Sequence, residues 1–334
     1  MYDIAGQVAQ WLAAGDAVHI AHIVATKGFS SREPAAALAW TDDGLQCGAL
    51  LPRVDAMLTA SGAQLDGRLA ESTVTDADAV AAGLSCGGTA TVFVQNASAY
   101  PADVWPRLGR HEPLCLVSEI VADAPGHTVL YTPQTVRDAA QHGGSTDVPR
   151  LFARGTSAAA LSVEGDTSVA VVTLWPTTEL LVVGTGAIAT ALVDVAALLG
   201  WTSAVTEDLA EIAQHAVRLT RADAVVVLSH DRATDVPALE VVLSGQAGYV
   251  GALGSRGTQA ARREGLLERG VDETALARIH GPAGLEVDAH TPAEIAVSIV
   301  AEVLASRSGS SGGSISNRGG PVHTGGVHAP PPRN

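Results

Sequence analysis

Several residue types are scarce in this chain of 334 residues, and each scarcity excludes a class of protein. The three cysteines, Cys47, Cys86 and Cys115, are too few and too scattered for a disulfide framework or a C-x-x-C metal site. Twenty Lys and Arg against 35 Asp and Glu leave a net charge of −15, which argues against a surface for duplex nucleic acid. Aromatic residues make up only 4%, so the interior must consist mainly of Ala, Val and Leu, as suits an α/β protein.

The N-terminus lacks the basic start, apolar core and cleavage site of a signal peptide. We therefore expect a cytoplasmic, soluble protein that contacts neither a membrane nor nucleic acid. Apolar residues make up 47% of the chain, enough for the cores of two domains. We place the domain boundary at Trp175-Pro176. The expected fold is α/β, with an N-terminal α+β domain over residues 1–175 and a Rossmann-like domain with a parallel sheet over residues 176–306.

The second domain is organised around Leu180–Trp201, which reads LLVVGTGAIATALVDVAALLGW. An apolar, β-branched run leads into Gly184, Gly186 and Ala189, and apolar residues at helical spacing then continue to Gly200. Strand, glycine-rich turn and helix in this order match the G-x-G-x-x-A dinucleotide fingerprint, in which the helix N-terminus faces an anion. A chance match and a membrane span are the competing interpretations, and an acidic residue in the middle of the segment argues against the span.

Further candidate ligand residues follow the other strands expected in this domain, where the carboxyl edge of a doubly wound sheet lines the ligand crevice. They are Glu207, His230, Asp231, Ser255 and Arg256. Glu207 suits a contact with a ribose hydroxyl, although helix N-termini also favour acidic residues. Arg256 precedes a helix that we expect to begin at Thr258, so it either binds an anion there or is simply solvated.

The N-terminal domain offers fewer candidates. Arg32 lies in a turn-rich loop, and Cys86 stands beside two glycines at the mouth of an expected strand. Cys86 is either a functional thiolate or a small buried hydrophobe. His19 and His22 have opposite parity on one expected strand, so they should not share a metal.

The last helix has a strong start signal. Thr291-Pro292-Ala293-Glu294 combines an N-cap, a proline at the first helical position and a capping-box glutamate. We expect this helix to run to about Ser306. Residues 307–334 are rich in Gly, Ser, Pro and His without apolar periodicity, which predicts a disordered tail.

Segments of both halves resemble a known family in order and spacing. They are Gly28–Pro34, Gly83–Gly88, Leu228–Asp231, Tyr249–Arg256, Gly281–Leu285 and Thr291–Ile299. The chain resembles the XdhC/CoxI family over about residues 5–306. Members of that family are maturation factors of molybdenum hydroxylases such as xanthine and carbon monoxide dehydrogenases.

The resemblance implies a cofactor chaperone rather than an enzyme with catalytic residues of its own. Such a protein binds the molybdenum cofactor (molybdopterin), assists its sulfuration by a cysteine desulfurase, and hands it to a molybdenum hydroxylase apo-enzyme. On this basis we expect Gly184, Gly186 and Arg256 to hold the anionic cofactor and Cys86 to contact the metal, in a homo-oligomer. The rival interpretations are an NAD-dependent oxidoreductase, supported by the glycine turn and Glu207, and a scaffold paralogue that binds a different nucleotide.

The chain departs from the family pattern at three places. The family usually has a Ser-Gly-Gly-Cys-Val-Glu element after its first hairpin, where this chain has Cys47–Val54 and lacks that cysteine and glutamate. Ala187 stands where the glycine turn commonly carries histidine, and Asp288 replaces a usual glycine. The missing cysteine leaves Cys86 as the matched thiol, so a divergent paralogue with another cargo stays open.

Overall fold

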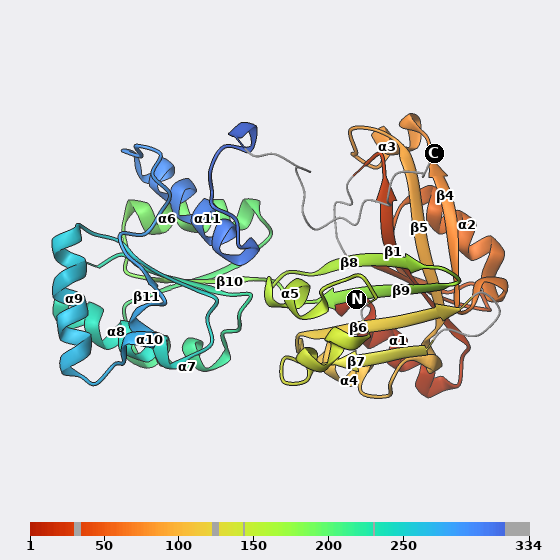
Figure 1. Ribbon diagram of the computed structural model, residues 1–334, viewed down its shortest axis with the longest axis horizontal. Helices are drawn as coiled ribbons and strands as arrows, with labels where there is room; N and C mark the ends of the chain where they lie inside the picture. The colour runs from red at the N-terminus through yellow and green to blue at the C-terminus, as the bar shows by residue number, and fades with distance from the viewer. Residues whose placement is uncertain (30–34, 122–126, 143, 230, 318–334) are drawn as a thin grey trace. The chain divides into compact units, whose positions relative to one another are not determined.

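The computed structural model describes residues 1–29, 35–121, 127–142, 144–229 and 231–317. Contacts divide the chain into two compact units (Figure 1). The N-terminal unit comprises Met1–Phe152 and Thr156–Pro176, and the Rossmann unit comprises Ala153–Gly155 and residues 177–317. The mixed α/β fold expected from the sequence is confirmed, with antiparallel sheets in the first unit and a parallel sheet in the second.

The first sheet of the N-terminal unit is antiparallel, in the order β3-β2-β1-β5-β4. Its strands are β1 (Val18–Lys27), β2 (Ala37–Thr41), β3 (Gln46–Gly48), β4 (Arg68–Val74) and β5 (Gly88–Asn96). Helices α1 (Tyr2–Ala14), α2 (Pro52–Ser61) and α3 (Asp76–Ala81) and the 3-10 turns η1 (Gly62–Leu65) and η2 (Ala97–Ala99) complete this part. Gly44, at φ 86°, turns the chain between β2 and β3, which pair as an antiparallel hairpin.

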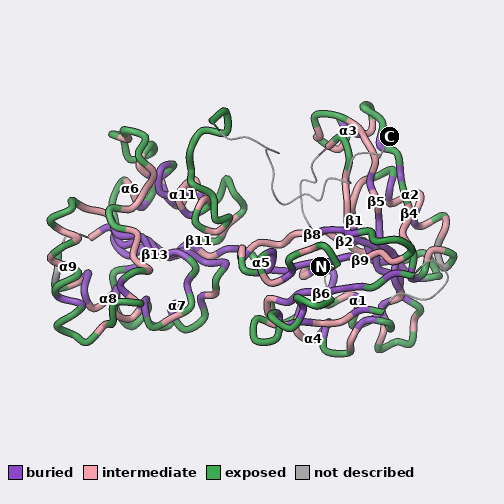
Figure 2. Tube along the Cα trace, viewed as in Figure 1, coloured by how far each residue is buried: buried purple, intermediate pink, exposed green. Residues whose placement is uncertain are grey.

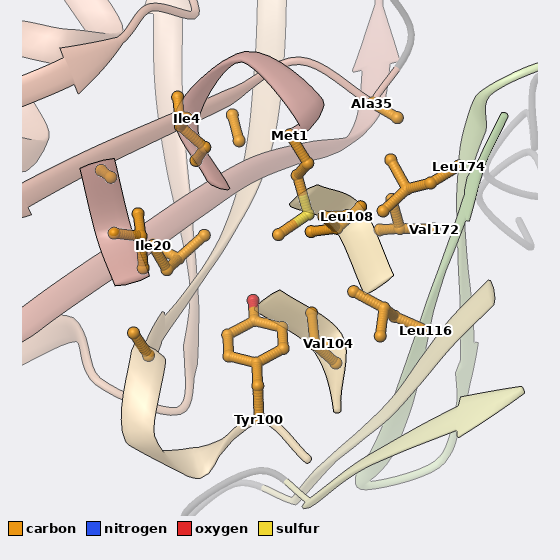
Figure 3. Close-up of a cluster of buried hydrophobic side chains, with 14 of the residues drawn as sticks. Met1, Ile4, Ile20, Ala35, Tyr100, Val104, Leu108, Leu116, Val172 and Leu174 are labelled. Atoms are coloured by element: carbon orange, nitrogen blue, oxygen red, sulfur yellow. The ribbon is translucent and has the colours of Figure 1, made fainter. Parts of the chain in front are cut away.

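The second sheet of this unit is also antiparallel, in the order β7-β6-β9-β8. It contains β6 (Leu114–Val121), β7 (His127–Tyr131), β8 (Ala158–Glu164) and β9 (Thr167–Leu174), with α4 (Val104–Gly109), η3 (Val136–Gln141) and α5 (Val148–Ala153) beside it in sequence. Ile4 and Leu108 from α1 and α4 pack with Ile20, Leu116 and Val172 from the two sheets in one hydrophobic cluster (Figure 3). One core therefore joins both antiparallel sheets.

The Rossmann unit holds a parallel sheet in the order β11-β10-β12-β13-β14. Its strands are β10 (Glu179–Val183), β11 (Thr202–Thr206), β12 (Ala224–Val227), β13 (Tyr249–Ala252) and β14 (Ile279–His280). Its helices are α6 (Ala187–Leu198), α7 (Leu209–Arg218), α8 (Arg232–Ser244), α9 (Arg256–Glu268), α10 (Glu273–Leu276) and α11 (Pro292–Ser308), followed by η4 (Ile315–Asn317). This is the doubly wound order 2-1-3-4-5, which reverses direction between β10 and β12, where such folds bind ligands.

Both faces of the parallel sheet are covered. Leu180 and Val182 of β10 pack under α6 and α11, whereas Leu181 and Val183 pack on the side of α7 and α8. The central strands are consequently buried along their length, as Figure 2 shows for the sheet of this unit. This explains why they read as continuous apolar runs rather than alternating ones.

Two helix ends lie two residues from the positions expected from the sequence. Helix α9 begins at Arg256 rather than Thr258, because the Ser255 hydroxyl caps it by accepting a hydrogen bond from the Thr258 N–H at 3.2 Å. The capping box predicted at the start of α11 is present, but that helix continues past Ser306 to Ser308 before Gly309 ends it at φ 65°.

Arg307 therefore belongs to a helix and not to the tail to which the sequence assigned it. Its guanidinium donates to the Thr178 hydroxyl at 3.1 Å and to the Gly155 carbonyl at 2.7 Å, and it lies 5.5 Å from the centre of the Trp201 ring. These three partners order the helix end. The predicted disorder of residues 318–334 lies outside the described residues.

Within the described ranges, no helix combines the length and the apolar character that crossing a bilayer requires. The apolar stretch Leu180–Trp201 is divided between a strand and a helix of the parallel layer.

Candidate functional site

The glycine turn joins β10 to α6 in a backbone conformation that side chains disfavour. Gly184 has φ 121° and Gly186 has φ 107°. A Cβ atom at Gly184 would lie 3.1 Å from Cβ of Leu228, so this glycine allows the turn to approach the end of β12 closely. A Cβ atom at Gly186 would meet nothing within 4 Å, so that glycine faces open space. Ala189 of α6 is 3% exposed and packs in the core with residues of β10 and β12, in the role that the fingerprint gives it.

The N-terminus of α6 faces this open space. Gly186 is the N-cap and has no side chain with which to accept a hydrogen bond from the first turn. The first N–H groups of an α-helix have no acceptor within the helix, and the helix dipole adds partial positive charge there. The arrangement suits an anionic group such as a phosphate.

A cavity of about 450 Å³ lies at the carboxyl ends of the strands, next to the glycine turn. It is lined by Gly184, Thr185, Ala187, Ile188, Glu207, Leu228, Ser229, Leu253 and Pro292. These residues follow or flank β10, β11, β12 and β13 and include the first residue of α11. The cavity therefore occupies the switch point of the sheet, and we call it the crevice.

Glu207 is the crevice-lining residue with an ionisable side chain within the described part of the chain. Its carboxylate accepts a hydrogen bond from the Thr185 hydroxyl at 3.2 Å, which ties it to the glycine turn. The neighbouring Asp208, not Glu207, caps α7 by accepting from the N–H groups of Ala210 and Glu211. Glu207 is therefore not the residue that caps α7. A contact between Glu207 and a ligand stays a prediction.

The other predicted ligand residues do not all meet at the crevice. Asp231 caps α8 by accepting from the Ala233 N–H at 3.0 Å, and Ser255 caps α9. Arg256 is the exposed first residue of α9 and is not in the set that lines the crevice as far as the chain is described. His230 and Arg32 lie outside the described residues. The ligand roles of all five residues stay predictions.

Sequence reasoning missed a buried ion pair beside the crevice. Arg262 is 2% exposed, and its Nε donates to Asp235 Oδ2 at 2.8 Å. The same guanidinium donates to the carbonyl oxygens of Ser229 and Leu253, each at 2.6 Å. A signal was available, because Arg262 precedes Leu266 by one helical turn and so shares the buried face of α9.

A second missed group fixes the loop after β14. Glu302 of α11 accepts hydrogen bonds from the Tyr249 hydroxyl at 2.6 Å and the Gly284 N–H at 2.7 Å, and its other oxygen lies 3.2 Å from Nδ1 of His280. Burial alone would raise the pKa of Glu302, but these hydrogen bonds outweigh it and hold the pKa below its usual value. Burial raises the pKa of Tyr249, so its hydroxyl stays a donor. The segment Gly281–Leu285 is thereby attached to α11.

The departures from the family pattern have structural counterparts. Ala187 begins α6 and lines the crevice with a methyl group, where the resemblance expects an imidazole. Asp288 has φ 55°, the left-handed region that favours glycine, at the position where the resemblance expects glycine. The backbone conformation is thus one that glycine favours, although the residue has changed.

The cysteines occupy different environments. Cys86 is exposed, and its thiol donates to the Gly28 carbonyl at 2.7 Å, so it is not the small buried hydrophobe of the alternative interpretation. Cys115 is buried within β6, and burial raises the pKa of its thiol; burial also raises the pKa of Cys47. Among the residues that the structure describes, no group of three or more His, Cys, Asp and Glu side chains could hold a metal. A metal contact by Cys86 therefore stays a prediction.

Comparison with known proteins finds a family model that is similar to the Rossmann unit. Residues 180–303 match the family model of the XdhC Rossmann domain. A stretch of 79 residues is 37% identical to the uncharacterized protein YqeB of Escherichia coli (strain K12), and it covers 24% of this chain and 15% of that protein. The match thus spans a small part of this curated relative.

Among solved structures, a xanthine dehydrogenase from Bacillus halodurans aligns with 90% of this chain and 95% of its own, at a TM-score of 0.50 and 19% sequence identity. At that identity the likeness concerns the fold.

Proposed function

We propose, because residues 180–303 match the family model of the XdhC Rossmann domain, that the protein is an accessory factor for a molybdenum hydroxylase. It would bind the molybdenum cofactor in the crevice, assist its maturation, and deliver it to an apo-enzyme of the xanthine or carbon monoxide dehydrogenase type. A cysteine desulfurase and a second copy of the chain are the further partners that we propose. The observation that carries the proposal is the crevice itself, a cavity of about 450 Å³ against an uncapped helix N-terminus.

The chemistry of the crevice suits a cargo that is flat at one end and anionic at the other. The N–H groups at the start of α6 favour a phosphate, and the open space at Gly186 lets it approach the backbone. Ile188, Leu228 and Leu253 give the cavity apolar walls, as a planar ring system requires. Molybdopterin combines these features, with a pterin ring and a phosphate.

In the N-terminal unit we propose, independently of the crevice, that the exposed thiol of Cys86 binds molybdenum. A thiolate is a soft ligand, which favours a sulfur-coordinated metal such as molybdenum. The thiol is exposed, and its contacts among the described residues are with the Gly28 carbonyl and the Ser85 hydroxyl. A metal can therefore reach it without unfolding the chain.

One observation favours a second candidate function. The hydrogen bond between Thr185 and Glu207 places a carboxylate at the rim of the crevice, where it could accept hydrogen bonds from a ribose diol. A nucleotide such as NAD would use both the carboxylate and the helix N-terminus. Within this alternative, the protein is an NAD-dependent oxidoreductase or a paralogue that carries another nucleotide.

The ligand that co-purifies with the protein tests both candidates. The chain is expressed together with cofactor synthesis, and bound pterin is measured by fluorescence after oxidation, molybdenum by metal analysis, and nucleotides by chromatography. Pterin and molybdenum in stoichiometric amounts support the carrier. NAD alone supports the second candidate, and a protein that carries none of them and binds none in calorimetry refutes the crevice as a ligand site.

A matched pair of glycine variants tests the crevice itself. Gly186→Val places a side chain in the space assigned to the phosphate, whereas Gly200→Val also puts valine at a positive φ, 71°, beyond the other end of α6, with nothing within 4 Å. Each change costs about 1–3 kcal/mol of backbone strain. Ligand retention should be lost in the first variant only. Arg256→Ala, with Arg263→Ala as its control, tests the arginine, for which a charge-assisted contact predicts about tenfold weaker binding.

A further inference from the structure

We propose that Arg262 is the positioning residue of the crevice, because it binds the backbone at the ends of two neighbouring strands that form the crevice wall. The inference rests on the proposed function to the extent that the crevice binds a ligand. It adds a residue that touches no ligand and yet sets the geometry that a ligand meets.

The two strand ends are held by one planar group. Arg262 reaches the carbonyl of Leu253, directly after β13, with one terminal nitrogen, and the carbonyl of Ser229, just after β12, with the other, both at 2.6 Å. Ser229 and Leu253 both line the crevice. Because the guanidinium is rigid, the two loops cannot change their separation without breaking one of these hydrogen bonds.

The guanidinium is itself fixed from behind. Asp235 of α8 is fully buried, and its Oδ2 lies 2.8 Å from Nε and 2.6 Å from the terminal nitrogen that also binds Ser229. Four elements, namely α8, α9 and the ends of β12 and β13, are thus connected through one side chain. Gly254 follows the Leu253 carbonyl at φ 129°, and a Cβ atom there would lie 3.2 Å from the Thr258 side chain of α9, so a glycine lets the strand end approach this helix closely.

Core stability alone does not account for this arrangement. Removing two charges from water is costly, and replacing a buried ion pair by apolar residues of similar volume is often neutral or stabilising. An apolar pair, however, could not bind two carbonyl oxygens at fixed positions. The benefit specific to arginine is therefore the placement of the strand ends, which prepares the crevice for a ligand and spares the cost of ordering it upon binding.

The test compares two adjacent arginines on α9. Arg262→Lys keeps the positive charge but loses the planar fork, and Arg263→Lys makes the same change in an exposed pair with Glu273. The probes are ADP-ribose in calorimetry and molybdopterin retained after co-expression. Hydrogen exchange of the amides in residues 228–231 and 253–256 reports on the two strand ends without a ligand.

We expect Arg262→Lys to weaken binding of whichever probe the wild type binds by about tenfold, as for the loss of charge-assisted hydrogen bonds, and to accelerate exchange at both strand ends. Arg263→Lys should change neither. A purely structural role would lower the melting temperature and leave the affinity of the folded variant unchanged, which would overturn the inference. A wild type that binds neither probe would instead refute the proposed function of the crevice.

A second variant covers the case in which Arg262→Lys does not fold. Asp235→Asn keeps an oxygen that can accept from Nε and leaves both carbonyl contacts possible. We expect a smaller loss of affinity in the same direction, with faster exchange at residues 228–231. Unchanged affinity together with unchanged exchange in this variant would also overturn the inference.

Discussion

Residues that follow different strands meet at one cavity in the Rossmann unit, whereas the candidate residues of the N-terminal unit are scattered. In the Rossmann unit all strands run parallel, so the residues after β10, β11, β12 and β13 meet at one edge and form the crevice. In the N-terminal unit neighbouring strands are antiparallel, and its cysteines stand on β3, before β5 and within β6 of two different sheets. The comparison shows that parallel topology converts a repeated position in the sequence into one place in space, whereas antiparallel topology does not.

The largest loss of stability is expected at the buried pair of the Rossmann unit, Asp235 and Arg262. Asp235→Ala leaves the Arg262 guanidinium buried without its carboxylate, and we expect a loss of about 3–5 kcal/mol in the free energy of unfolding. Glu273→Ala, which breaks the exposed pair with Arg263, should cost less than about 1 kcal/mol. Calorimetry and urea unfolding measure both. Equal effects in the two variants would show that burial does not distinguish these pairs.

The two units should lose stability at different pH values as the solution is acidified. Burial lowers the pKa of His22, in the N-terminal unit, from 6.5 to about 3, so the unfolded chain takes up a proton below pH 6.5 that the folded chain excludes. This unit therefore loses stability as the pH falls from about 6.5 toward 3. The pKa of Glu302, in the Rossmann unit, lies below its usual 4.5. Its stabilising effect is therefore complete above pH 4.5 and is lost only as the pH falls further.

Hydrogen exchange resolved along the chain between pH 7 and pH 3 measures this difference, with protection expected to decline first around β1. His22→Gln should flatten the decline, and His127→Gln, at an exposed histidine, serves as the control. Protection lost simultaneously in both units would contradict the assignment.

Smaller losses of stability are expected for the cysteine variants of the N-terminal unit. Cys115→Ser buries a hydroxyl in the core of β6 and should destabilise the protein by about 1–3 kcal/mol without affecting its cargo. Cys86→Ser keeps a donor for the Gly28 carbonyl, so we expect unchanged melting but a reduced molybdenum-to-protein ratio after co-expression with cofactor synthesis. Full molybdenum content in Cys86→Ser would show that Cys86 does not bind the metal and would leave the crevice as the proposed cofactor site.

The smallest effect is expected at the C-terminus. A chain that ends at Asn317 should change the free energy of unfolding by less than about 0.5 kcal/mol, because the composition of the removed residues, rich in Gly, Pro and His, predicts no contribution to a packed core. A chain that ends at Ser306 also loses the contacts of Arg307 with Thr178 and Gly155 and should lose about 1–2 kcal/mol. Thermal melts of the two chains distinguish the cases, and identical melts would mean that Arg307 contributes nothing.

Features that depend on residues close together in the sequence could be predicted from it. The glycine turn depends on residues within one strand–helix connection, and the capping box of α11 depends on Thr291 and Glu294 alone, so both could be found without the fold. The start of α9 was missed by two residues because Gly257 obscures a helix that Ser255 already caps.

Features that depend on distant partners escaped prediction. Arg307 binds residues 129 and 152 positions away, and nothing near it in the sequence indicates them. Arg262 and Asp235 are 27 positions apart on different helices and meet only because α8 and α9 pack against the same face of the sheet. Their pairing depends on tertiary packing, which periodicity within one helix cannot report.

The lining of the crevice has a consequence for how this protein could change over evolutionary time. Glu207 alone, among the described residues that line it, bears a charge; the others contribute backbone, methyl groups or hydroxyls. Glu207 is exposed and follows β11, an edge strand, so a mutation there leaves the packed layers intact. A lineage could therefore exchange one anionic or diol-bearing cargo for another through a single codon, while the scaffold that presents it drifts neutrally.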